Sequence, residues 1–474
     1  MTGALGLRNI RLFIAFRVFF NNRFYYPVFT ILFVDYGLTV EQFSLLNAVW
    51  ALTIVVAEAP SGALADALGR KRLLVLAALL TIAELALISF APVGNISLLF
   101  SLFLISRILS GLADAASSGA DEAIAYDSLV AAGLVSQWPR ALSAQMRLTA
   151  LFFVVSSISG SWLYDPAAMN GLRQCFGLFP NLTQSDTMRF PMYATLVLAI
   201  INLPVTLAFQ EPGDRLPVEP PRERFREPSA EPHEGTASTV NSAVQHAFRR
   251  QLWRSFGNIV AAARWIVASK LAMAIILIGM LHDHILRLSV TLTSQYFRIC
   301  NLPESRFGLI NAAVSVIGLF VPKLAEFLVS RYHLTTNWLI SAGIGLTGLF
   351  LLAGFQLWLG IAAVLLSFMA MMLTSFFVSH YLNAITGSDI RATVLSFKGM
   401  VFNLGYGMAG ILLALAMRVG HETASGTANG TAGGTIADGA AGFVQAVRFF
   451  PWYFLILLAF LLPLCRRWAR MAKK

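Results

Sequence analysis

Long apolar stretches alternate with short polar segments along almost the whole chain. A membrane-spanning helix needs ~20 predominantly apolar residues, and about twelve stretches meet this length. We therefore expect an all-α integral membrane protein with about twelve transmembrane helices. The predicted spans are 10–34, 44–65, 73–91, 97–120, 141–163, 190–209, 270–297, 306–329, 336–355, 358–382, 392–417 and 443–464.

A polar, proline-rich segment divides these spans into two groups of six. We expect an N-terminal six-helix bundle over 1–210, a cytoplasmic linker over 211–262 and a C-terminal six-helix bundle over 263–474. Composition predicts that the first part of the linker is disordered. Residues 243–258 place apolar side chains at helical spacing among arginines, which fits a basic helix lying on the inner leaflet and equally a plain linker helix.

Composition and charge support a membrane protein. The chain is 57% hydrophobic and only 12% charged, whereas soluble proteins carry about 25% charged residues. The first apolar run lacks a small-residue cleavage site, so we expect a span and not a cleaved signal peptide. The net charge of +11 would suit nucleic acid, but its placement favours the membrane surface.

The basic residues gather in segments that the spans place on one face of the membrane. By the positive-inside rule this face is cytoplasmic, and both termini lie there. The protein is then a multi-pass protein of the plasma membrane or the bacterial inner membrane. The basic residues concerned are Arg8, Arg11, Arg70, Lys71, Arg72, Arg140, the arginines of 215–264, Lys323, Arg331 and the basic residues of 466–474.

The most specific motif lies between the second and third spans, where residues 62–72 read GALADALGRKR. We expect a short charged loop at the membrane face, with a sharp turn at Gly69 through a positive φ. Asp66 can accept hydrogen bonds from a helix start or from Arg70. The segment resembles the G-x-L-x-D-x-x-G-R-[RK]-[RK] loop of the major facilitator superfamily.

This resemblance implies two related halves that rock around a central site near the membrane midplane. It also implies that Asp66 docks near Arg391, at the start of the eleventh span, and holds the cytoplasmic side closed. The residues expected at this gate are Gly62, Asp66, Gly69, Arg70, Arg72 and Arg391.

Ionisable residues inside spans are costly in lipid and are functional candidates by default. Arg107 stands in the fourth span and shares a helical face with Gly111 and Asp114. The stretch resembles the family's second motif, L-x-x-R-x-x-Q-G-x-G-x-A, with Ser110 in place of the glutamine. The resemblance implies proton coupling through Arg107 and Asp114. The alternative is a structural arginine held by backbone carbonyls or by Asp114.

The first span carries Arg17, Asn21 and Phe24 on one face, with Tyr25 adjacent. In the family that the chain resembles, the first, fourth, seventh and tenth helices line the cavity. A face of arginine, asparagine and aromatic residues suits an anionic or polar organic solute. The alternative is hydrogen bonding between helices.

The seventh span holds His282, Asp283, His284 and Arg287. Asp283 and Arg287 are four residues apart and can pair on one helix face. We place His282 and Asp283 at the cavity. Histidine titrates near neutral pH and can relay a proton, so we give the neighbouring Asp283 a part in proton coupling. An ion pair of purely structural function is the alternative. Adjacent helical residues point about 100° apart, so we expect no metal site here.

Further polar residues lie in other spans. His380 and Asn383 in the tenth span are additional cavity candidates. Glu58, near the inner end of the second span, and the acidic segment 121–127 are additional gate candidates; a solvated helix end is the alternative for the latter. Glu84, in the middle of the third span, is expected to be protonated or paired, and we assign it no function.

These observations lead us to expect a secondary active transporter, with no cofactor, that moves a small organic solute by alternating access and coupling to protons. Export of amphiphilic or anionic compounds is favoured over proton-coupled uptake of a polar metabolite. A non-transporting sensor on the same fold is a further alternative. The chain lacks the G-x-x-x-x-G-K-[ST] motif and a clustered catalytic set, which disfavours ATP-driven transport and enzymatic function. We expect a monomer. Cys175 and Cys300 both fall in predicted outward loops; two unpaired thiols are favoured, and a disulfide between them is the alternative.

Overall fold

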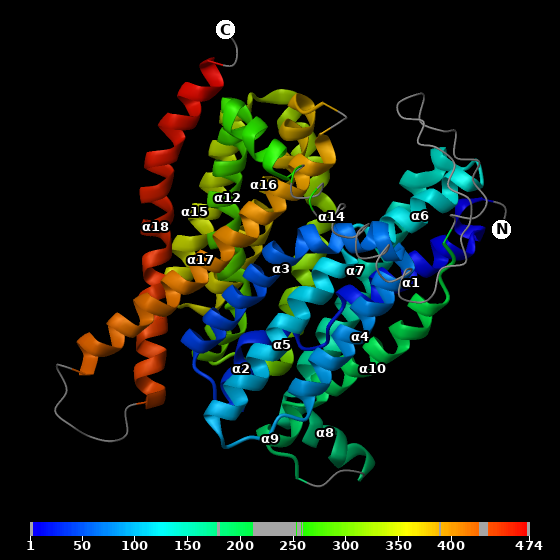
Figure 1. Cartoon of the computed structure of the whole chain (residues 1–474). Helices are drawn as coiled ribbons and strands as arrows, with labels where there is room; N and C mark the ends of the chain where they lie inside the picture. The colour runs from blue at the N-terminus through cyan, green and yellow to red at the C-terminus, as the bar shows by residue number, and fades with distance from the viewer. Residues whose placement is uncertain are drawn as a thin grey trace.

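The computed structural model describes residues 3–177, 181–211, 253, 257, 259–387, 390–425 and 435–471. Within these residues all regular structure is helical, and eleven helices are long and apolar enough to cross a membrane. They pack side by side, and α1 begins at the same end of the molecule at which α18 ends (Figure 1). We call this end the terminal face. The segments predicted as a disordered linker and as the helix 243–258 lie almost entirely outside the described residues.

The first half comprises residues 3–211 and the second half residues 259–471. The helices of the first half are α1 (Arg8–Asn21), α2 (Phe29–Tyr36), α3 (Val40–Leu68), α4 (Arg70–Ser89), α5 (Ile96–Ser117), α6 (Ala120–Ala131), α7 (Trp138–Tyr164), α8 (Pro166–Phe176), α9 (Gln184–Thr187) and α10 (Phe190–Leu207). Those of the second half are α12 (Lys270–Thr291), α13 (Thr293–Ile299), α14 (Phe307–Arg331), α15 (Leu334–Ala353), α16 (Leu357–Ile385), α17 (Arg391–Ser425) and α18 (Thr435–Met471).

The first predicted span is not one helix. It is broken between α1 and α2 by residues 22–28, which include a 3₁₀ turn over Tyr26–Val28. Because α1 ends at Asn21, the N–H of Phe24 has no partner within the helix, and it donates to Thr195 Oγ1 at 3.0 Å. Irregular backbone at membrane depth needs such partners inside the protein. This broken segment accounts for eleven continuous spanning helices where about twelve spans are predicted.

The predicted loop at 62–72 is also mostly helical. The helix α3 continues through Gly62 to Leu68, because the alanines and leucines here are strong helix formers. The turn is confined to Gly69, whose φ of 94° confirms the expected positive φ. Arg72 lies exposed in the first turn of α4.

The halves meet where small residues allow backbones to approach, as is common between membrane helices. The helix α17 packs on α3, and α14 packs on α7. A Cβ added at Gly410 would lie 3.0 Å from the Ser44 carbonyl oxygen, and one at Gly308 would lie 2.2 Å from that of Ser157. Glycines at these positions therefore set the contact distance between the two halves.

Gly160 gives a test of this close packing within the first half. A Cβ at Gly160 would lie 1.8 Å from the Phe24 carbonyl oxygen, at the break between α1 and α2. We expect Gly160→Ala to destabilise the protein by about 1–3 kcal/mol, measured as a lower melting temperature in detergent. The control is Gly343→Ala, where a Cβ meets nothing within 4 Å and helix propensity favours alanine. Equal melting temperatures for the two variants would contradict this packing.

Candidate functional site

A cavity of about 980 Å³ lies between the two halves. It reaches the terminal face, since its lining includes Pro139 and Leu142 at the start of α7 and Pro322 in the last turns of α14. Among its polar lining residues are Asn21, Arg23, Tyr25, Trp50, Arg107, Asp114, Arg287, Asn311 and Tyr406. Both halves therefore contribute to one chamber.

Three buried charges meet at the first-half wall of this cavity. Glu84 of α4 is 0% exposed and accepts hydrogen bonds from Arg23, at 2.9 and 3.1 Å, and from Arg107 Nη2, at 2.8 Å. Arg23 also donates to the Tyr25 hydroxyl at 2.9 Å. The guanidinium of Arg107 lies 5.6 Å from the ring centre of Phe29, a cation–π contact. We call Arg23, Glu84 and Arg107 the buried charge triad.

Arg107 and Asp114 line the cavity from the same helix but have different partners. Asp114 Oδ2 accepts a hydrogen bond of 2.9 Å from Trp50 Nε1 of α3, whereas Arg107 donates to Glu84. Gly111 lies between them, where an added Cβ would come within 3.0 Å of Trp50 and Thr53. The missing side chain brings α3 close enough for the indole to reach Asp114.

A second polar cluster belongs to the second half. Arg287 pairs with Asp283 one turn earlier in α12, as the spacing predicts, and donates to Asn403 Oδ1 at 3.0 Å. Its guanidinium lies 4.9 Å from the ring centre of Tyr406. The rings of Tyr406 and Trp50 meet edge to face at 6.3 Å, so aromatic side chains connect the two clusters across the cavity.

The structure divides the residues predicted on the first span. Asn21 and Tyr25 line the cavity, but Arg17 and Phe24 are not among its described lining residues. Arg17 is paired with Asp121 and Glu122 of α6, a partner that the sequence did not reveal.

The other polar residues predicted in the second half are not among the described residues that line this cavity. His282 is buried, and its Nδ1 lies 2.8 Å from the Ile278 carbonyl oxygen. Asp283 reaches the site only through Arg287. His380 is exposed and stacks on a neighbouring phenylalanine, and Asn383 donates to Ser379 at 3.3 Å.

The predicted gate residues are described in part. Arg70 pairs with Asp127 of α6, and Arg391 donates to the Thr386 carbonyl oxygen at 3.2 Å. The side chain of Asp66 lies outside the described residues, so its docking beside Arg391 stays a prediction. Cys175 and Cys300 are both free thiols.

Glu58, which the sequence analysis placed near the gate, makes a contact between the two halves. Its carboxylate accepts a hydrogen bond of 3.2 Å from Ser396 of α17.

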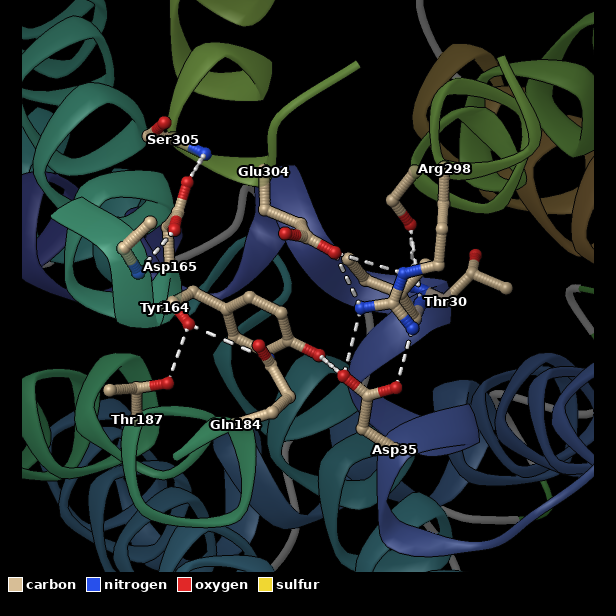
Figure 2. A network of polar contacts seen from close by, with 12 residues as sticks. Thr30, Asp35, Tyr164, Asp165, Gln184, Thr187, Arg298, Glu304 and Ser305 are labelled. Carbon is tan, nitrogen blue, oxygen red and sulfur yellow. Dashed lines mark hydrogen bonds and ion pairs between the residues drawn. The ribbon is translucent and has the colours of Figure 1, made fainter. Parts of the chain in front are cut away.

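A polar network closes the side of the cavity opposite the terminal face, and we call it the outer network (Figure 2). Asp35, at the end of α2, accepts a hydrogen bond of 2.8 Å from Arg298 Nη2 of α13 and one from the Tyr164 hydroxyl. Arg298 also pairs with Glu304 at 3.0 Å. Burial by itself would lower the pKa of Arg298, but its hydrogen bond to Asp35 and the negative charges around it raise that pKa above its ordinary value.

Two further hydrogen bonds extend this closure. Asp165 Oδ2 accepts from the Ser305 backbone N–H at 3.1 Å, and Thr30 donates to the Thr291 carbonyl oxygen at 2.7 Å. Each joins the first half to the second. Sequence reasoning missed Asp35, Arg298 and Arg23. The available signal was their position as charges inside or at the end of apolar spans. Sequence reasoning expected Glu84 to be protonated or paired but assigned it no function, and the structure shows it paired.

Comparisons with known proteins agree with this architecture. A model of the Major Facilitator Superfamily matches residues 11–445, so the chain belongs to this superfamily. No curated protein matches it in sequence. Its fold is similar to that of the nucleoside transporter NupG, with TM-score 0.67, 14% identity, and coverage of 98% of this chain and 99% of that one.

Two other solved structures are similar at comparable identity. A bacterial homologue of the human lysosomal transporter Spinster has TM-score 0.63 and 14% identity, covering 98% of this chain and 96% of that one. A D-xylose–proton symporter has TM-score 0.57 and 12% identity, covering 94% and 96% respectively. The chain thus has the fold of major facilitator transporters.

Glu84→Gln tests the buried charge triad. The substitution leaves Arg23 and Arg107 buried without their anionic partner, and breaking a buried pair in this way costs about 3–5 kcal/mol. We expect a large fall in melting temperature. Asp127→Asn is the control: it also removes a carboxylate paired with arginine, but at an exposed site, where about 0–1 kcal/mol is at stake. Similar losses in both variants would argue against the triad's structural importance.

Asp35→Asn tests the outer network. It removes the charge that joins α2 of the first half to Arg298 of the second, so we expect the outer side to open more often. The measurement is the rate at which a membrane-impermeant thiol reagent, added on the side opposite the terminal face, labels a cysteine introduced at Thr291, which lines the cavity. Glu304→Gln is the control, because Glu304 and Arg298 belong to the same half. Faster labelling in the control than in Asp35→Asn would contradict a lock between the halves.

Proposed function

We propose that this protein is a secondary active transporter that carries a small organic solute through the central cavity, driven by protons. The observation that carries the proposal is the cavity itself. It lies between the two halves, is open toward the terminal face, is closed opposite that face by the outer network, and is walled by two charge clusters. One access path with a closed opposite side is what alternating access requires.

We infer that the terminal face is cytoplasmic. The basic residues outside the spans support this orientation by the positive-inside rule. With this orientation the cavity faces the cytoplasm. The structure of the Spinster homologue is described as inward-facing and unoccupied, and a cytoplasm-facing cavity would be the corresponding state of this chain.

We assign proton binding to Asp114. Glu84 is fully buried and both its oxygens are occupied by arginines, whereas Asp114 lines the cavity and accepts from a neutral indole. A proton arriving from cavity water therefore reaches Asp114 more directly. Neutralising Asp114 weakens the hydrogen bond from Trp50, because bonds to ionised acceptors are about twice as strong as neutral ones.

Trp50 offers a route from this proton to the other half. Its indole N–H holds Asp114, and its ring edge meets Tyr406, which lies against Arg287. Movement of the indole on protonation would disturb the contact between α3 and α17, where the halves meet. Proton binding in the first half would in this way alter the packing of the second half.

The cavity walls suggest the kind of solute. Apolar and aromatic side chains predominate, and Arg147 and Arg287 are basic lining residues outside the buried charge triad, which favours an amphiphilic or anionic compound. Proton-coupled uptake of a polar metabolite is the second candidate, motivated by the amides of Asn21 and Asn311 in the lining and by the fold shared with a D-xylose–proton symporter. A thermal-shift screen of nucleosides, pentoses, dipeptides and amphiphilic anions would identify a solute for transport assays.

Asp114→Asn tests the coupling. In proteoliposomes we expect the wild-type protein to accumulate labelled solute in response to a pH gradient, and the variant to lose this response but retain counterflow exchange. The asparagine mimics a permanently protonated carboxyl. Trp50→Phe keeps the aromatic edge and removes the N–H donor, so its accumulation should fall in the same way.

Three results would overturn parts of this proposal. Indifference of wild-type transport to the pH gradient removes proton coupling. Full accumulation by Asp114→Asn moves the proton to another group. Absence of counterflow with every solute bound in the screen favours a non-transporting sensor.

A further inference from the structure

A second cavity, of about 540 Å³, lies on the outside of the second half. It is a groove between α12, α17 and α18, formed by Leu288, Leu412, Ala416, Phe449 and Trp452 together with Arg448. We call it the α17/α18 groove. The central cavity shares none of its described lining residues with this groove.

The groove faces outward, toward the surrounding lipid. Leu412 is 49% exposed, Phe449 53% and Trp452 56%, although all three lie in membrane-spanning helices. Its residues come from the end of α12, the last turns of the span 393–418 and the first turns of the span 440–463. All of these are at the end of the bundle opposite the terminal face.

Arg448 is the unusual member of this lining. It is exposed, and it stands inside the apolar span 440–463, about 12 Å along the helix from the start of that span. A charged side chain at such a depth is costly in lipid unless it reaches the interface or meets an opposite charge. Gln445, one turn nearer the membrane surface, also lines the groove and adds an amide.

These features match one ligand chemistry. The apolar walls suit a hydrocarbon chain, and a guanidinium matches the geometry of a phosphate through paired hydrogen bonds. An arginine that lies between transmembrane helices can hold an anionic headgroup in this way on either side of the membrane, because the pairing of guanidinium and phosphate depends on local geometry. We propose that the α17/α18 groove binds an anionic phospholipid of the leaflet opposite the terminal face, with an acyl chain along Leu412 and Phe449 and the phosphate on Arg448.

Native mass spectrometry of the full-length, delipidated protein in detergent tests this site. Phosphatidylglycerol and phosphatidylcholine with identical chains serve as probes. We expect phosphatidylglycerol to bind the wild-type protein more tightly, and Arg448→Gln to weaken its binding about fivefold. Arg331→Gln, the same change at an exposed position at the end of α14, should leave binding unchanged.

Leu412→Trp tests the apolar part, because the larger side chain fills the groove. It should weaken binding of both lipids, while melting temperatures near the wild-type value show that the variants fold. Unchanged phosphatidylglycerol binding in Arg448→Gln, or equal wild-type affinity for the two lipids, would overturn the proposal. A dimer of the wild-type protein that Leu412→Trp abolishes would overturn it as well, because a second copy of the chain would then cover the groove.

Discussion

The architecture of the first half depends on the placement of one carboxylate in a low-dielectric interior. Glu84 is completely buried, and so are the two arginines that reach it from the broken first span and from α5. Each of these charges alone would be very unfavourable there, and together they compensate one another. The triad consequently ties α4, α5 and the segment between α1 and α2 into one unit, and that unit forms a wall of the cavity.

The same constraint explains why the first span is broken. A continuous helix would direct the backbone groups of residues 22–28 into its own hydrogen bonds and would place Arg23 differently. The break directs Arg23 toward Glu84, while Thr195 satisfies the freed N–H of Phe24. Gly160 permits the close approach of α7 to this segment. Charge compensation and close packing therefore support one another at this wall of the cavity.

Contacts between the halves are distributed unequally along the membrane normal. Opposite the terminal face, Asp35 and Arg298 form a partly buried network with Tyr164 and Glu304 (Figure 2). Toward the terminal face the described cavity separates α7 from α14, while α3 and α17 remain in contact, with Glu58 and Ser396 in a hydrogen bond. The contact of α3 with α17 can therefore serve as a hinge between the halves, and the cavity stays accessible from the terminal face.

The sequence by itself determined the approximate positions of eleven spans, the turn at Gly69 and the pairing of Asp283 with Arg287, whereas the break in the first predicted span appeared only in the structure. These depend on hydropathy and on spacing within one helix, which a linear pattern contains. It also identified Arg107 and Asp114, because charges within apolar stretches are conspicuous. Only the tertiary structure decided their partners. Glu84 reaches Arg107 across 23 positions, Trp50 reaches Asp114 across 64, and Arg298 reaches Asp35 across 263, so each contact depends on which helices pack together. Arg17 shows the limit clearly: its helix face fits a cavity as well as it fits α6, and only packing distinguishes the two.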